Sequence, residues 1–138
     1  MVEIRVPVSP GELIDKITIL RIKAARIAEP AKLANVRLEL ARLEETWAAS
    51  PFAHGDIEAD EQALGAVNER LWAIEDEIRA KEREQAFDAD FIRLARAVYI
   101  ENDERAAIKR RINVKLGSAI VEEKSYAAYG RASGSTNP

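Results

Sequence analysis

A chain of 138 residues, 47% of them hydrophobic and 33% charged, has the size and composition of one soluble globular domain. The lack of cysteine excludes disulfides and thiolate chemistry, a single histidine excludes a histidine-rich metal cluster, and we expect no bound metal or cofactor. The net charge of −3 argues against a nucleic-acid partner, and charges throughout the first twenty residues exclude a signal peptide and a membrane span, which favours a cytoplasmic protein.

The N-terminal segment VEIRVPV alternates apolar and charged side chains, with Val2, Ile4 and Val6 separated by Glu3 and Arg5. A period of two predicts a short β-strand. A single strand needs a partner, which is either another part of this chain or the same strand of a second subunit.

The first helix is predicted to begin at about residue 10, because Ser9 and Glu12 have the spacing of a capping box around Pro10. Pro30 ends this helix and suits the first turn of a second one. The second helix carries an apolar row with heptad-like spacing, formed by Leu33, Val36, Leu40, Leu43 and Trp47.

A third helix is predicted over about residues 57–85, with an apolar row formed by Leu64, Val67, Leu71, Ile74 and Ile78. A fourth follows a cap at Asp88 or Asp90 and stops at Gly117. We therefore expect a mostly α fold of two helical hairpins in a four-helix arrangement with a short N-terminal β-strand. It is one helical domain over residues 1–126, followed by a flexible tail over residues 127–138.

Polar residues interrupt the apolar face of the fourth helix at Asn102, Arg105 and Lys109. Arginine presents a planar fork of donors that fits a phosphate or a carboxylate, so these three residues are a candidate anion site. The alternative is that they are solvated or paired to acids of the third helix, because buried charges are almost always paired.

The third helix supplies a polar row beside its apolar one, formed by Asn68, Trp72, Glu75, Arg79 and Glu82. Glu75 or Glu82 opposite Arg105 or Lys109 predicts a ladder of ion pairs between the two helices. In the functional interpretation, Asn68, Trp72, Glu75 and Arg79 line a polar cleft in which Trp72 is the apolar wall.

Five cations and no acid occur between residues 105 and 115. Such a run can hold a phosphate backbone, but no nucleic-acid-binding motif and no aromatic residue for base stacking accompany it. Cations in the last turns of a helix are also expected from the helix dipole. We do not expect a nucleic-acid partner.

Several segments resemble, in order, a family of small bacterial proteins of unassigned function, over about residues 8–126. They are ELIDKITIL, NVRLEL, LWAIEDEIR, FIRLARAVY, NDERAAIKRRIN and GSAIVEEKSY. The resemblance implies a helical domain that occurs alone or attached to proteins of sugar-transfer and surface-polysaccharide pathways. It implies no activity and no catalytic residues.

The segment ELIDKITILRIKAARI is also similar to the first helix of the all-helical chorismate mutases, dimeric enzymes that bind a dicarboxylate through Arg and Lys side chains. The similarity implies this role for Arg21, Arg26, Lys32, Arg105 and Lys109. The spacing from Asp to Arg departs from the pattern of that family.

Two functions remain open. The first is a non-catalytic dimeric module that binds or regulates another protein, since the orphan strand and the apolar rows of the second and third helices favour a homodimer. The second is a small helical enzyme or sensor that binds an anionic metabolite, a sugar nucleotide or a dicarboxylate, through Asn102, Arg105 and Lys109.

Overall fold

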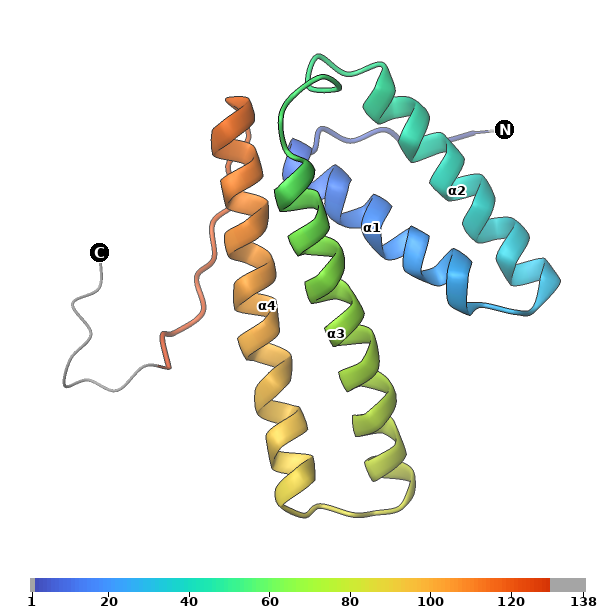
Figure 1. The fold of residues 1–138 in the computed structure, drawn as a ribbon, viewed down its shortest axis with the longest axis vertical. Helices are drawn as coiled ribbons and strands as arrows, with labels where there is room; N and C mark the ends of the chain where they lie inside the picture. Colours follow the sequence, from blue (N-terminus) through green and yellow to red (C-terminus); the bar gives the residue numbers. More distant parts are fainter. Residues whose placement is uncertain (1, 130–138) are drawn as a thin grey trace.

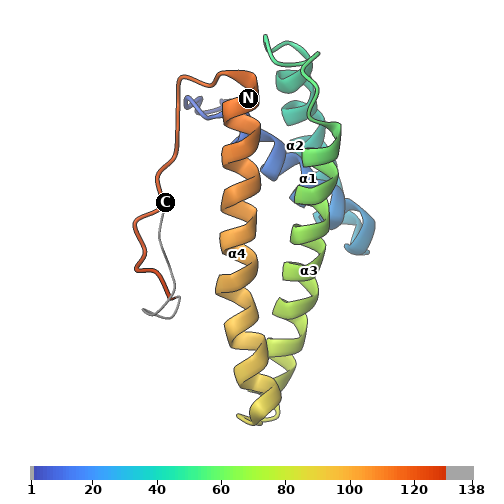
Figure 2. The same ribbon diagram turned by 60° about the vertical axis from the view of Figure 1, so that its left-hand side comes forward.

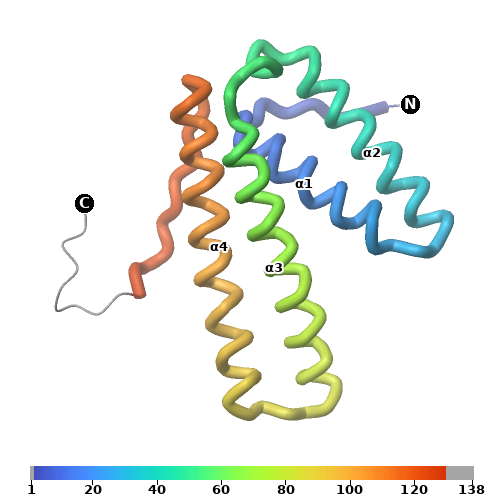
Figure 3. The backbone as a smooth tube through the Cα atoms, in the orientation of Figure 1, coloured from blue at the N-terminus to red at the C-terminus, as the bar shows by residue number. Residues whose placement is uncertain are grey.

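The computed structural model describes residues 2–129, and in this range four α-helices form two antiparallel hairpins (Figure 1). The helices are α1 (Pro10–Arg26), α2 (Pro30–Ala48), α3 (Glu58–Arg83) and α4 (Ala89–Leu116). The two hairpins meet at one end, where α1 begins, and then diverge (Figure 3). The prediction of a mostly α fold with two helical hairpins is confirmed.

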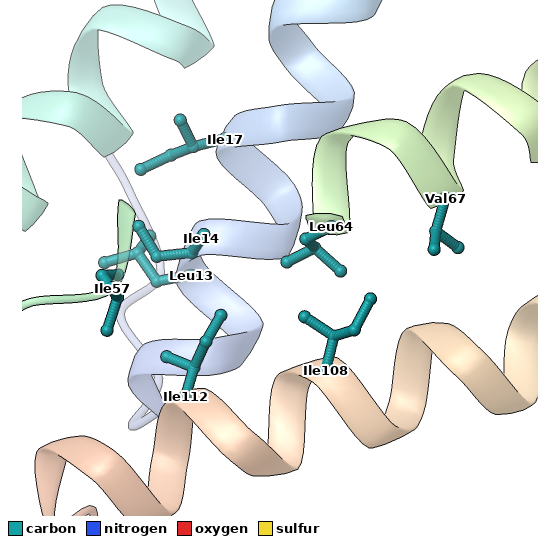
Figure 4. Packing of buried hydrophobic residues seen from close by; sticks show 8 residues of the cluster. All are labelled: Leu13, Ile14, Ile17, Ile57, Leu64, Val67, Ile108 and Ile112. Atoms are coloured by element: carbon teal, nitrogen blue, oxygen red, sulfur yellow. The ribbon is translucent and has the colours of Figure 1, made fainter. Parts of the chain in front are cut away.

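Helix α1 is the central element of this arrangement, because it packs against all three other helices, whereas α2 packs against α1 alone. The core lies where α1 crosses the α3–α4 hairpin (Figure 4). Its buried side chains are Leu13, Ile14, Ile17, Ile57, Leu64, Val67, Ile108 and Ile112. Helix α2 contributes no buried residue, so its predicted apolar row stays half-buried.

The helix ends follow the local signals of the sequence. The Ser9 hydroxyl accepts a hydrogen bond from the Glu12 amide at 3.1 Å, and Asp88 accepts one from the Phe91 amide at 2.9 Å. Gly117 ends α4 with φ of +66°, a left-handed conformation that glycine adopts at little cost. The predicted caps at Ser9, Asp88 and Gly117 are therefore confirmed.

The predicted N-terminal strand is absent from the described residues. Residues 2–8 are extended but make no backbone hydrogen bond within the part of the chain that the structure describes. Val2 and Ile4 are 99% and 91% exposed. The segment contacts α2 through Glu3, whose carboxylate accepts two hydrogen bonds from the Arg42 guanidinium at 2.9 and 2.5 Å. The strand does not form because residues 2–129 place no second extended segment beside this one.

Beyond α4, residues 118–129 run back along the outer side of that helix (Figure 2). We call this segment the C-terminal strap. Of the predicted flexible tail, residues 130–138 lie outside the described residues. Between residues 2 and 129, no helix is both long enough and apolar enough to cross a membrane.

Candidate functional site

A buried polar cluster lies where the first turns of α1 meet α3 and α4. Its centre is Asp15, whose side chain is only 1% exposed. Around this carboxylate stand Glu12 and Thr18 of α1, Asn68 of α3, and Arg105 and Lys109 of α4. We call these six residues the Asp15 cluster.

Asp15 and Arg105 form the tightest contact of the cluster. The Arg105 Nε lies 3.0 Å from both carboxylate oxygens, and its Nη2 lies 2.5 Å from Oδ2. Asn68 donates a fourth bond to Asp15 at 2.9 Å and a bond of the same length to the Thr18 hydroxyl. The hydrogen bonds that Arg105 donates to Asp15 raise the pKa of the guanidinium above its ordinary value. The buried carboxylate is thus paired and hydrogen-bonded, and these interactions offset the cost of removing its charge from water.

Lys109 is the second cation of the cluster, with a side chain 15% exposed. Its ammonium lies 2.5 Å from Glu12, 3.8 Å from Asp15 and 3.5 Å from Glu122 of the C-terminal strap. Glu122 also accepts a hydrogen bond from the Ser9 hydroxyl at 2.8 Å. One ammonium therefore connects α1, α4 and the strap.

The structure brings together four of the seven predicted site residues. Asn68, Arg105 and Lys109 belong to the Asp15 cluster, and the Asn102 side chain accepts a bond from Arg105 at 3.3 Å. A ligand-binding role for these four residues stays a prediction.

The other three predicted residues lie elsewhere. Glu75 and Arg79 pair with each other on the surface of α3 at 3.1 Å, and Trp72 lies under the guanidinium of Arg26. The prediction that Glu75 or Glu82 pairs with Arg105 or Lys109 is wrong. Helix α1, and not α3, supplies the acids, because α1 crosses the hairpin at the level of these cations.

Glu12 and Asp15 were not predicted as partners of the cations. The signal was present in α1, where Gly11, Asp15, Thr18 and Ile22 follow one another at spacings of three and four, and all four are buried. A short acid inside a buried helical face indicates a paired charge. What the sequence does not contain is the identity of the facing helix.

All five cations of the basic run between residues 105 and 115 have carboxylate partners. Arg110 pairs with Glu123 at 3.4 Å, and Arg111 and Lys115 both pair with Asp60. Together with the Asp15 cluster, these pairs neutralise the whole run. The run therefore offers no unpaired row of cations to a phosphate backbone.

The cations named by the second resemblance also pair separately. Arg21 contacts Glu61 at 2.7 Å, Arg26 contacts Glu69 at 2.5 Å, and Lys32 contacts Glu29 at 3.4 Å. Each has a partner different from those of Arg105 and Lys109. This pairing gives no common dicarboxylate site.

A surface hollow of about 870 Å³ lies between α4 and the C-terminal strap. Val98, Tyr99 and Tyr126 line its apolar part, and Asn102 and Arg110 line its polar part. Within residues 2–129, no three His, Asp or Glu side chains are placed together as ligands for a metal ion.

The Asp60 ion pairs lead to a prediction about acid. Asp60 is buried at the start of α3, and the contact with the Lys115 ammonium at 2.7 Å, then the hydrogen bond from Arg111, holds its pKa below the ordinary value. The ionised carboxylate therefore stabilises the fold at neutral pH, and this contribution is lost as the pH falls below about 4 toward the lowered pKa. We expect Asp60→Asn to be less stable than wild type at pH 7 and to lose less stability on acidification.

Urea unfolding at a series of pH values measures this difference. The expected result is that the two stability curves converge at low pH. Parallel curves for Asp60→Asn and wild type would exclude Asp60 as a source of acid sensitivity.

One protein-family model, described as a family of unknown function (DUF6165), matches residues 4–137. Comparison with curated proteins and with solved structures finds no match to the chain.

Proposed function

The chain belongs to this family of unknown function, which supplies no activity to carry over, and we propose that it is a non-catalytic dimeric interaction module. The Asp15 cluster supports a structural role for the buried charges, because each of them is paired inside the chain. Helix α2 buries its apolar row only in part, and the N-terminal segment leaves its apolar side chains in solvent. In the apolar row of α3, in contrast, Leu64 and Val67 are buried in the core and Leu71 packs against it.

The observation that carries the proposal is the exposed N-terminal segment over residues 2–6. Val2, Ile4 and Val6 alternate with charged residues and are all exposed, and the backbone of the segment is unpaired within the described residues. Exposed, extended backbone with alternating apolar side chains is a template for strand pairing. The exposed Glu3–Arg42 pair places this segment beside α2.

A second copy of the chain is the partner that fits this segment. In an antiparallel pair centred on Ile4, Val2 of each copy lies opposite Val6 of the other, and Glu3 lies opposite Arg5. Such a register pairs apolar residues on one face and opposite charges on the other, and both arrangements stabilise neighbouring strands. It also has the two-fold symmetry of most homodimers.

Sedimentation velocity over a range of protein concentrations tests the dimer. Ile4→Asp places two carboxylates opposite each other at the two-fold axis and is expected to weaken association by at least about tenfold, or 1.4 kcal/mol. The matched control is Leu38→Asp, which changes an exposed apolar residue of α2 outside the segment.

A wild-type chain that stays monomeric at every concentration would overturn the proposal. An equal loss of association in both variants would show that the dimer interface is not centred on residues 2–6.

Binding of an anionic metabolite is the second candidate function, and the contact between Lys109 and Glu122 favours it. Arg105 is already occupied by the buried Asp15, whereas the third partner of Lys109 is a carboxylate on the surface strap. If a ligand binds the predicted residues, it does so at Lys109 on the side that faces the strap.

A further inference from the structure

The carboxylate of Glu122, whose side chain is 46% exposed, lies against the start of α1 at a place that we call the recess. Its donors are the Ser9 hydroxyl at 2.8 Å and the Lys109 ammonium at 3.5 Å, and it borders a hollow of about 310 Å³ beneath the strap. Ser9 is itself buried, with 1% of the residue exposed. Within residues 2–129 its hydroxyl proton has no acceptor besides Glu122.

The charges of the recess are balanced only when Glu122 is in place. Without it, the neighbourhood holds the carboxylates of Glu12 and Asp15 and the cations of Lys16, Arg105 and Lys109. The cations then outnumber the carboxylates by one, although Lys109 keeps Glu12 at 2.5 Å, and the buried hydroxyl of Ser9 lacks an acceptor within the described residues. Both deficits are met by one oxyanion, and the dipole at the N-terminus of α1 favours the same sign of charge.

We propose that this recess is a binding site for a small oxyanion, a carboxylate or a phosphate monoanion, and that Glu122 is its tethered internal occupant. A free ligand with the same chemistry displaces Glu122 and takes over the bonds to Ser9 and Lys109. The site is independent of the dimer, because none of its residues lies in the N-terminal segment 2–6.

The strap is attached in a way that allows this exchange. After Ser118, whose amide bonds to the Asn113 carbonyl at 2.9 Å, the strap makes no backbone–backbone hydrogen bond within the described residues. Side chains hold it instead, through Glu123 with Arg110, Lys124 with Asp103 and the edge of Tyr129 against Tyr99. Exposed ion pairs of this kind contribute little to stability, so a ligand competes mainly with the local concentration of Glu122.

Displacement of Glu122 has a consequence for the surface of α4. The strap also covers the hollow of about 870 Å³ that Val98 and Tyr99 line. Loss of the Glu122 contact loosens the cover of this hollow, so oxyanion binding and exposure of the outer face of α4 are coupled.

The test is a titration with sodium acetate, followed by the amide and side-chain NMR signals of Ser9, Gly11 and Lys109, with sodium chloride at equal ionic strength as the blank. Glu122→Ala removes the internal occupant, and we expect the acetate-dependent shifts to saturate at about tenfold lower concentration than in wild type. Glu123→Ala is the matched control, because it removes the neighbouring strap carboxylate that pairs with Arg110 outside the recess. It is expected to behave as wild type.

A second variant separates the recess from general effects of charge. Glu122→Ala combined with Ser9→Gly removes the buried hydroxyl and keeps a residue that caps helices well. It is expected to return the acetate titration to the wild-type range. A parallel titration with inorganic phosphate decides which oxyanion binds more tightly.

Equal titration curves in wild type, Glu122→Ala and Glu123→Ala, for both anions, would overturn the proposal. So would a gain of binding in Glu122→Ala that survives the loss of the Ser9 hydroxyl.

Discussion

Replacing Asp15 by alanine is expected to lower the free energy of unfolding by about 3 kcal/mol. The substitution removes the acceptor of three bonds from Arg105 and of one bond from Asn68. Arg105 keeps its positive charge in a half-buried position without a partner, and this uncompensated charge is the larger part of the cost. Urea unfolding at pH 7 measures the loss.

Arg79→Ala is the control for this prediction. Like the pair of Asp15 and Arg105, the pair of Glu75 and Arg79 joins an arginine to an acid, but it lies on the surface. We expect it to change stability by less than about 0.5 kcal/mol. A double-mutant cycle of Asp15→Ala and Arg105→Ala should show that the two losses are not additive. A loss for Asp15→Ala as small as that for Arg79→Ala would mean that the Asp15 cluster does not hold α1 against α4.

Gly11→Ala is expected to destabilise the protein by about 2 kcal/mol, although alanine is the better helix former. A Cβ atom at Gly11 would lie 2.5 Å from the backbone oxygen of Lys109 and 2.8 Å from Oδ1 of Asn113. Backbone cannot give way as a flexible side chain can, so α1 and α4 have to separate. The separation also breaks the 2.7 Å bond from the Gly11 amide to Asn113. Thermal and urea unfolding measure the effect.

The same substitution at Gly65 is expected to have the opposite effect on stability. Gly65 lies within α3, and a Cβ atom there meets nothing within 4 Å. We expect a gain of about 0.5–1 kcal/mol from the better helix propensity of alanine. If both glycine variants shifted stability in the same direction, close approach of α1 and α4 at Gly11 would not explain its effect.

The sequence by itself determined the helices and their ends. The residues that mark these ends act through backbone geometry and through bonds to neighbours a few residues away, so their effect is readable without knowledge of the fold. They are Pro10, which follows Ser9, and Pro30, Asp88 and Gly117. The apolar rows of α3 and α4 were readable for the same reason, since helical periodicity places them on one face.

Only the tertiary structure decided which residues meet. Arg105 and Lys109 were recognisable as misfits on an apolar face, but their acids lie 90 and 97 positions away in the chain. The angle at which α1 crosses the hairpin selects Asp15 and Glu12 over Glu75 and Glu82, and that angle depends on the packing of side chains such as Ile14 and Ile108.

The N-terminal segment also shows the difference between local pattern and tertiary pairing. Its alternation of apolar and charged residues predicted a strand, but a strand also requires hydrogen bonds from a neighbour, and none pairs with this segment within the described residues. Local pattern determines conformation because it acts through each residue's own backbone and side chain. Pairing is decided by the tertiary structure, because the free energy of an ion pair or a strand pair depends on which partner the fold brings within reach.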